Sequence, residues 1–239
     1  MRGLHPGQRA AIFSGGVSLP TDIAGLETYI DASLETGLSD TDAVTTPTEQ
    51  SGNSVGFTQG GAAGLKPRYL VDQFGSLPGY DFIAANSQRW EIASGWTVAS
   101  GDKTLVSVVD IDLETGQRIL LDVETGRIIC GIDGTGDEYA FYDGAWRASG
   151  TAGATGAQVL IYVLEAGGTA RIYRGLSLIG SGLSYTQQAV GGKARIGSDN
   201  TDATFFDGRI GMQAFYSAAM SDSDRVALTS SLMSKWGIS

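Results

Sequence analysis

Short apolar segments alternate with turn signals along the chain from Leu26 onward. Such segments, recurring about every 8 to 12 residues, predict an all-β sandwich. Glycine stands in the connections at Gly116, Gly126, Gly134 and Gly144, where it supplies the positive φ that hairpin turns need. Strands joined so tightly must be antiparallel. The clearest expected strands span residues 104–111, 118–123, 127–132, 138–142, 158–164, 170–174 and 205–216.

The faces of these strands differ in pattern. In the segment 205–216, period 2 predicts one core face and one face toward water, with Arg209 and Gln213 on the water side. The expected core side of that segment consists of Phe206, Gly208, Ile210, Met212, Ala214 and Tyr216. The segment 159–164 is apolar at every position, which predicts a central strand covered on both faces.

A single amphipathic helix is expected at the C-terminal end. The hydroxyl of Ser221 suits the N-cap, and acidic residues follow it in the first turn. Leu228, Leu232 and Trp236 then recur every four residues, and Gly237 suits the position after the last turn. The pattern therefore predicts a helix that packs its apolar stripe on the sandwich.

Residues 1–24 differ from the rest of the chain. They are rich in small residues, show no sustained period, and carry Arg2, His5 and Arg9 against only Asp22. We interpret them as an N-terminal arm preceding a domain at 25–239. Two readings of the arm stay open: a passive leader, or an assembly anchor that orders on a partner.

Composition narrows the function classes. A formal net charge of −10 argues against a nucleic-acid groove, because phosphate binding needs clustered cations. The single cysteine, Cys130, lies in an apolar stretch and is interpreted as a buried core thiol. The chain start resembles no signal peptide, and no apolar run approaches about 18 residues, so we expect a soluble protein made in a cytoplasm, with no membrane partner.

The C-terminal part carries five motifs in a fixed order: RIG at 195–197, FDGRIG at 206–211, FY at 215–216, MSDSDR at 220–225 and KWGI at 235–238. In order and spacing these motifs resemble the closing segment of concanavalin A-like, laminin-G-like jelly rolls. Segments 26–32, 50–53 and 80–82 look like the opening strands of the same domain in phage and bacterial versions. The resemblance implies two antiparallel sheets closed by one C-terminal α-helix. Departures are Met220 and Asp224, where the family has Leu and Glu, and the segment 211–213, where an acidic residue often stands.

The fold hosts lectins, glycosidases and virion modules, so residues must decide between them. Asp110, Asp112 and Glu114 resemble the E-x-D-x-E signature of a retaining glycosidase family that shares this fold. The nucleophile position holds the shorter Asp110, and no supporting motif precedes it. We therefore favour the other reading, a strand that ends in a turn.

Two further groups are candidates for binding. Asp199, Asn200 and Asp202 form an expected loop whose oxygens suit Ca²⁺, although loop Asx residues are more often simple turn formers. No other cofactor is expected. A group of aromatic residues could form a platform for stacking a sugar ring, although most such residues fill the core or the sheet surface: Trp90, Trp96, Trp146, Tyr142 and Tyr139.

The segment 4–10 resembles leader sequences of bacteriophage virion proteins. The leading hypothesis is therefore a non-enzymatic virion surface protein, such as a capsid decoration, head-fibre or tail-associated module. Its expected partners are other capsid or tail proteins, further copies of itself and host-surface glycans. The second hypothesis is a carbohydrate-binding module, and the third is a glycosidase using Asp110, Asp112 and Glu114.

Overall fold

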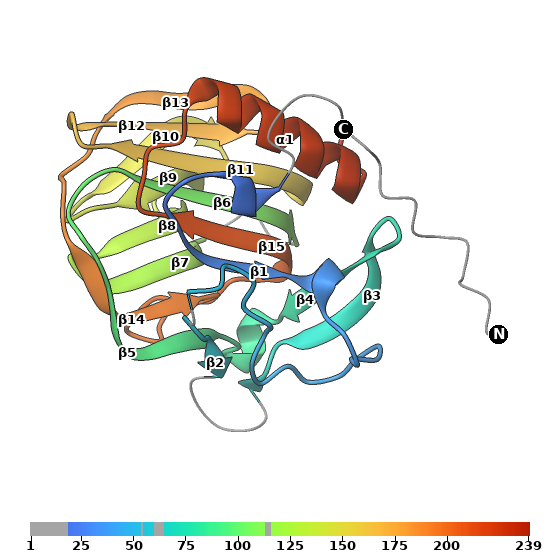
Figure 1. Cartoon of the computed structure of the whole chain (residues 1–239). Coiled ribbons are helices and arrows are strands. Elements are labelled where there is room, and N and C mark those ends of the chain that lie inside the picture. The colour runs from blue at the N-terminus through green and yellow to red at the C-terminus, as the bar shows by residue number, and fades with distance from the viewer. Residues whose placement is uncertain (1–18, 54, 60–64, 113–115) are drawn as a thin grey trace.

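The computed structural model describes residues 19–53, 55–59, 65–112 and 116–239, and it is a sandwich of two antiparallel sheets with one C-terminal helix (Figure 1). Sheet A follows the order β13(Ser177–Ser184), β12(Thr169–Arg174), β11(Gly156–Glu165), β6(Lys103–Ile111), β15(Gly208–Tyr216), β4(Leu77–Phe82) and β3(Arg68–Phe74), and β1(Leu26–Asp31) also pairs with β15. Sheet B follows the order β10(Trp146–Ala152), β9(Glu138–Tyr142), β8(Ile128–Ile132), β7(Arg118–Thr125), β14(Val190–Ile196), β5(Trp90–Val98) and β2(Thr58–Gln59). The predicted fold class is confirmed.

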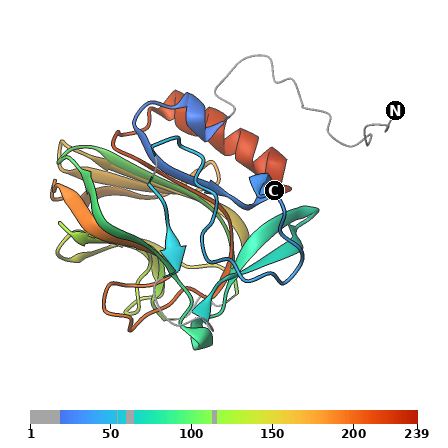
Figure 2. The same ribbon diagram turned by 60° about the horizontal axis from the view of Figure 1, so that its bottom comes forward.

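Two apolar layers hold the molecule together. The larger core lies between the sheets and includes Trp90, Ile128 and Tyr162. The second lies between the outer face of sheet A and α1(Asp222–Trp236), where Leu228 and Trp236 are buried. Figure 2 shows the helix on the outside of the sandwich. The central strands of sheet A are thus buried on both faces, whereas no helix of the described residues covers the outer face of sheet B.

The strand β11 bears out the prediction of a central strand. It pairs with β6 on one side and β12 on the other. Leu160 and Tyr162 point into the core between the sheets, while Val159 and Ile161 belong to the layer under the helix. An apolar side chain at every position is therefore what this environment requires.

The six residues of 205–216 expected in the core are all buried, but they do not share one face, and the expected water face is wrong for Gln213. The strand begins only at Gly208, and its pairing with β6 shifts register between Ile210 and Met212. A β-bulge of this kind puts the residues on either side of it on opposite faces. Ile210 accordingly faces the core between the sheets and Met212 faces the helix. Gln213 is buried rather than exposed, and its side-chain amide donates to the hydroxyl of Ser107 at 3.2 Å.

The C-terminal helix forms as predicted. Ser221 caps it, since its hydroxyl accepts a hydrogen bond of 3.1 Å from the backbone N–H of Asp224. Gly237 ends the helix in the left-handed conformation. Within the described ranges, no helix is long and apolar enough to cross a membrane.

The described end of the expected arm packs on the domain. The short helix η1(Pro20–Asp22) lies next to Tyr216, whose hydroxyl donates to the carbonyl of Pro20 at 3.1 Å. Ile23 is buried in the layer under α1. Pro20 and Ile23 therefore pack on the domain, while the boundary at residue 24 stays a prediction. Arg2, His5 and Arg9 lie outside the described residues.

Cys130 occupies the core position expected for it. Its side chain is buried between the sheets, and burial raises the pKa of the thiol well above its ordinary range. A thiol held neutral in this way is a poor nucleophile.

Candidate glycan-binding face

Two of the expected platform residues, Trp90 and Trp96, lie in the core. Trp90 is 0% exposed, and its indole N–H donates to the carbonyl of Val44 at 3.0 Å. Trp96 packs edge to face on Phe215 with ring centroids 5.5 Å apart. Tyr139, at 0% exposed, is likewise buried. The interpretation of these three residues as a surface platform is wrong, because their strand positions point between the sheets.

Tyr142 and Trp146 do lie together on the outside of sheet B. They face each other across the pair β9 and β10, with ring centroids 5.6 Å apart and planes at 66°. Both rings are half-buried. Their neighbour in register is Ile129 of β8, which alternates with core residues and therefore points outward. We call Tyr142 and Trp146 the aromatic pair.

Register continues this outward row across the sheet. Residues directly opposite one another in antiparallel strands share a face. Pairing therefore aligns three charged and three apolar or aromatic side chains in a row from β5 to the aromatic pair, with Arg195, Asp122 and Ile129 buried in its middle: Glu91, Arg195, Asp122, Ile129, Tyr142 and Trp146.

Arg127 links the aromatic pair to the charged part of the row. Its guanidinium carbon lies 5.4 Å from the centroid of the Tyr142 ring, which is cation–π geometry. One Nη of the same group is 3.2 Å from Asp122 and 4.0 Å from Asp199. The Arg127 side chain is 32% exposed, so it covers the two carboxylates from the solvent side.

The loop after β14 closes over this row. The backbone N–H of Asn200 donates to Asp122 at 2.8 Å. Asp199 stabilises its own loop by accepting from the backbone N–H groups of Ala203 and Thr204, at 2.9 and 3.1 Å. Asp122 Oδ1 and Asn200 Oδ1 are buried and have no hydrogen-bond partner among the described residues.

The loop does not assemble the expected calcium ligands. Asp202 turns to Arg89 and Arg195, each at 3.2 Å, and Asp199 is used by its own backbone. In the part of the chain that the structure describes, no group of three or more His, Cys, Asp or Glu side chains is arranged to hold a metal ion. The guanidinium groups of Arg89, Arg127 and Arg195 contact the carboxylates that a cation would need as ligands. We therefore interpret residues 199–202 as a structural loop.

Burial has the largest effect on the pKa of Asp122 in this row. Burial raises the pKa of Asp122, and hydrogen bonds from Asn200 and Arg127 offset that rise only in part. The positive charge of Arg127 is meanwhile shared between two carboxylates. The face therefore offers an aromatic surface beside hydrogen-bonding groups, and two carboxylates compensate the charge of Arg127.

The glycosidase-like carboxylates lie elsewhere, at the end of β6 on sheet A. A guanidinium Nη of Arg209 is 3.5 Å from Asp110 and forms a shorter contact with Asp112. Arg209 Nε also lies 3.8 Å from Asp81, so the carboxylates belong to an ion-pair cluster. Burial raises the pKa of Asp110, and Arg209 counteracts that rise. Glu114, the third residue of the pattern, lies outside the described residues.

Comparisons with known proteins agree on the fold. No family model matches the chain, and no curated protein matches its sequence. Domain 4 of the Geobacillus stearothermophilus arabinanase AbnA, solved with arabinotriose, superposes with a TM-score of 0.62 at 14% identity, covering 84% of this chain and 97% of that one. The binding domain of Paraclostridial Mosquitocidal Protein 1 gives a TM-score of 0.57 at 12% identity over 89% of this chain and 53% of that one.

Trypanosoma rangeli sialidase, solved with the inhibitor DANA, gives a TM-score of 0.55 at 12% identity. The match covers 85% of this chain and 32% of the sialidase. The solved neighbours are thus carbohydrate-binding or glycosidase-related β-sandwiches. At these identities the likeness establishes the jelly-roll fold of this chain.

Residues of the face were only partly predictable. Trp146, Tyr142 and the loop 199–202 were singled out from sequence, and the fold brings them to one side of the sheet. Asp122 and Arg127, which join the two groups, were missed. The outward direction of Asp122 could not be found by alternation, because Leu120 and Leu121 both lie in the core and the pairing shifts register between Ile119 and Leu121.

Proposed function

We propose that this chain is a non-enzymatic carbohydrate-binding domain that uses the outer face of sheet B. The observation that carries the proposal is the half-buried aromatic pair on the face of sheet B, which no helix of the described residues covers. Aromatic rings offer an apolar plane to the C–H face of a sugar, and a few placed polar groups fix its orientation. Arg127 and the loop at Asn200 provide such groups next to the rings.

The proposed ligand is a neutral glycan. Arg127 shares its charge between Asp122 and Asp199, so it has little left for the carboxylate of an acidic sugar. Glu124 lies exposed on the same hairpin, and the chain has a formal net charge of −10. These negative charges would therefore repel an acidic glycan. The hydroxyl groups of a neutral glycan can instead both donate and accept hydrogen bonds on this face. The arabinotriose in the AbnA complex is consistent with this chemistry but belongs to that protein.

A glycan array tests the proposal. The intact chain is expected to bind neutral oligosaccharides, and Trp146→Ala or Tyr142→Ala to weaken the strongest signals by about tenfold or more, equivalent to about 1.4 kcal/mol. Leu178→Ala removes an exposed apolar side chain from the other sheet and serves as the control. Binding that is unchanged in both aromatic variants, or that is confined to acidic glycans, contradicts the proposal.

Absence of catalysis is part of the proposal. Asp110 and Asp112 are bound to the same guanidinium of Arg209, which favours a structural role for both. We expect no hydrolysis of β-glucans by the purified chain. Hydrolysis that Asp110→Asn abolishes would support the glycosidase alternative instead.

The biological setting we propose is the surface of a bacteriophage virion, as a capsid decoration, head-fibre or tail-associated module. Support comes from the sequence resemblance of the closing segment and of residues 4–10. In this setting residues 1–18 anchor the domain to other virion proteins or to copies of itself. A chain lacking residues 1–18 should keep its melting temperature but fail to join particles or oligomers. Normal assembly of that truncated chain would refute the anchor.

A further inference from the structure

A notch interrupts sheet A where β12 ends earlier than its neighbour β11. The last pair is Leu160 with Arg174, after which the backbone N–H of Gly175 donates to the carbonyl of Val159 at 2.8 Å. The chain then turns away at Gly175, whose φ is +56°. On its other side β11 continues to pair with β6 as far as Gly156. Within the described part of the chain, no strand covers residues 156–158 on the β12 side.

Backbone hydrogen-bonding groups face this notch. Along a strand, the N–H and C=O of every second residue point to the same side. Because the carbonyl of Val159 points toward the β12 side, the N–H and C=O of Ala157 point there too. The uncovered edge therefore offers one donor and one acceptor to a bound molecule.

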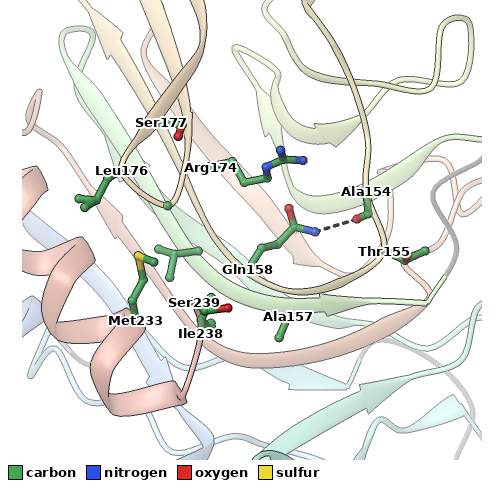
Figure 3. A pocket seen from close by; sticks show the side chains of 12 residues that line it. Ala154, Thr155, Ala157, Gln158, Arg174, Leu176, Ser177, Met233, Ile238 and Ser239 are labelled. Carbon is green, nitrogen blue, oxygen red and sulfur yellow. Dashed lines mark hydrogen bonds between the residues drawn. The ribbon is translucent and has the colours of Figure 1, made fainter.

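A pocket of about 470 Å³ occupies the notch. Figure 3 shows Arg174 and Gln158 on one side of the strand and Leu176 and Met233 together on the other. Ile238, past the end of α1, completes the apolar side. Leu176 is 51% exposed, so much of its surface remains to be covered. The pocket thus has a polar end and an apolar end, in the volume range of small-molecule sites.

Arg174 is the only charged side chain in the pocket lining. Eight of the ten arginines in the described ranges form ion pairs with carboxylates, and Arg118 and Arg174 are the two that do not. The guanidinium of Arg174 lies 5.9 Å from the centroid of the Tyr139 ring, a contact that leaves its N–H groups unneutralised. Arg174 is an exposed residue, and it has no carboxylate partner among the described residues of a chain with a formal net charge of −10.

The side chain of Gln158, next to Arg174, is already hydrogen-bonded within the protein. Its side-chain oxygen accepts from the hydroxyl of Tyr139 at 2.6 Å, and its amide nitrogen donates to the carbonyl of Ala154 at 2.8 Å. Tyr139 is in turn held by the backbone N–H of Ala154 at 3.0 Å. The wall beside Arg174 is therefore rigid, and the arginine is the group available for charge recognition.

We propose that this pocket binds a small organic carboxylate with an apolar body. The carboxylate pairs with the Arg174 guanidinium, whose fork geometry suits two parallel hydrogen bonds. The N–H of Ala157 is the additional donor at the strand edge. The apolar body covers Leu176 and Met233. This site is separate from the aromatic pair, which lies on the other sheet, so it stands or falls independently of glycan binding.

Hexanoate is a suitable probe, followed by amide and methyl NMR signals of the intact chain. We expect saturable shifts at Gly175, Leu176 and Met233, with hexanamide and acetate at least about tenfold weaker because each lacks one half of the ligand chemistry. Equal binding of hexanamide would overturn the role of charge. Shifts absent from the notch up to the solubility of hexanoate would overturn the site.

Matched variants locate the interaction. Arg174→Gln should weaken hexanoate binding by about tenfold or more, while Arg118→Gln, which removes the other arginine without an ion pair, should leave it unchanged. Amide spectra of both variants verify that the fold is kept. Unaltered hexanoate affinity in a folded Arg174→Gln protein would exclude the proposed pairing.

Discussion

Asp122 is the residue on which the polar half of the glycan-binding face depends. Its carboxylate accepts from Asn200 and from Arg127, and it is fully covered by them. A carboxylate removed from water in this way is held ionised at a cost, which only its two donors offset. Asp122 therefore connects the loop 199–202, through Asn200, with Arg127 in the turn between β7 and β8. Arg127 in turn contacts the aromatic pair.

The pKa of Asp122 is predicted to lie above that of an ordinary aspartate, about 3.9, because burial outweighs its donors. A raised carboxyl pKa lowers stability above the folded-state value, and this loss disappears as the pH falls through that value. The natural chain should thus gain stability relative to Asp122→Asn on acidification. Carboxyl ¹³C shifts give the pKa directly, and a value at or below 3.9 would contradict the argument.

Gly211 is predicted to be required by the helix rather than by the strand. A Cβ at this position would lie 2.7 Å from the ring of Trp236, closer than atoms can pack. Gly211→Ala should therefore cost about 1 to 3 kcal/mol of unfolding free energy in denaturant titration. Gly167→Ala is the control, since nothing lies within 4 Å of its Cβ. Equal stability of the two variants would show that the helix yields without cost.

The C-terminal helix is the element that completes sheet A. Trp236 is 1% exposed and contacts Phe74 edge to face, with centroids 5.1 Å apart. Trp236→Ala should destabilise the domain by about 3 to 5 kcal/mol. Val226→Ala, on the exposed side of the same helix, should have little effect. A loss below about 1 kcal/mol for Trp236→Ala in denaturant titration would make the helix peripheral.

Element types were more predictable than element faces. Strands with both faces buried, such as β11, are visible in the sequence as continuous apolar runs. The bulge between Ile210 and Met212 was not visible, because it depends on pairing with β6, which is distant in sequence. For the same reason Trp90 and Trp96 could not be assigned to the core before the packing of β5 was known.

At the scale of the whole molecule, the two sheets have different tasks. The central strands of sheet A are buried on both faces, between the core and α1. On the outer face of sheet B, the row that begins at Glu91 is buried in its middle and ends in the half-buried aromatic pair. This asymmetry follows from the single helix, and it is the basis of the proposed glycan site.

Titration with a neutral oligosaccharide from the array, followed by the indole N–H signals of the four tryptophans, tests this account most directly. Trp90, Trp96 and Trp236 are buried at 0%, 8% and 1% exposure, whereas Trp146 is only half-buried. The account predicts that the Trp146 signal shifts with saturation while the other three stay in place. A glycan that binds with the Trp146 signal unmoved would contradict it.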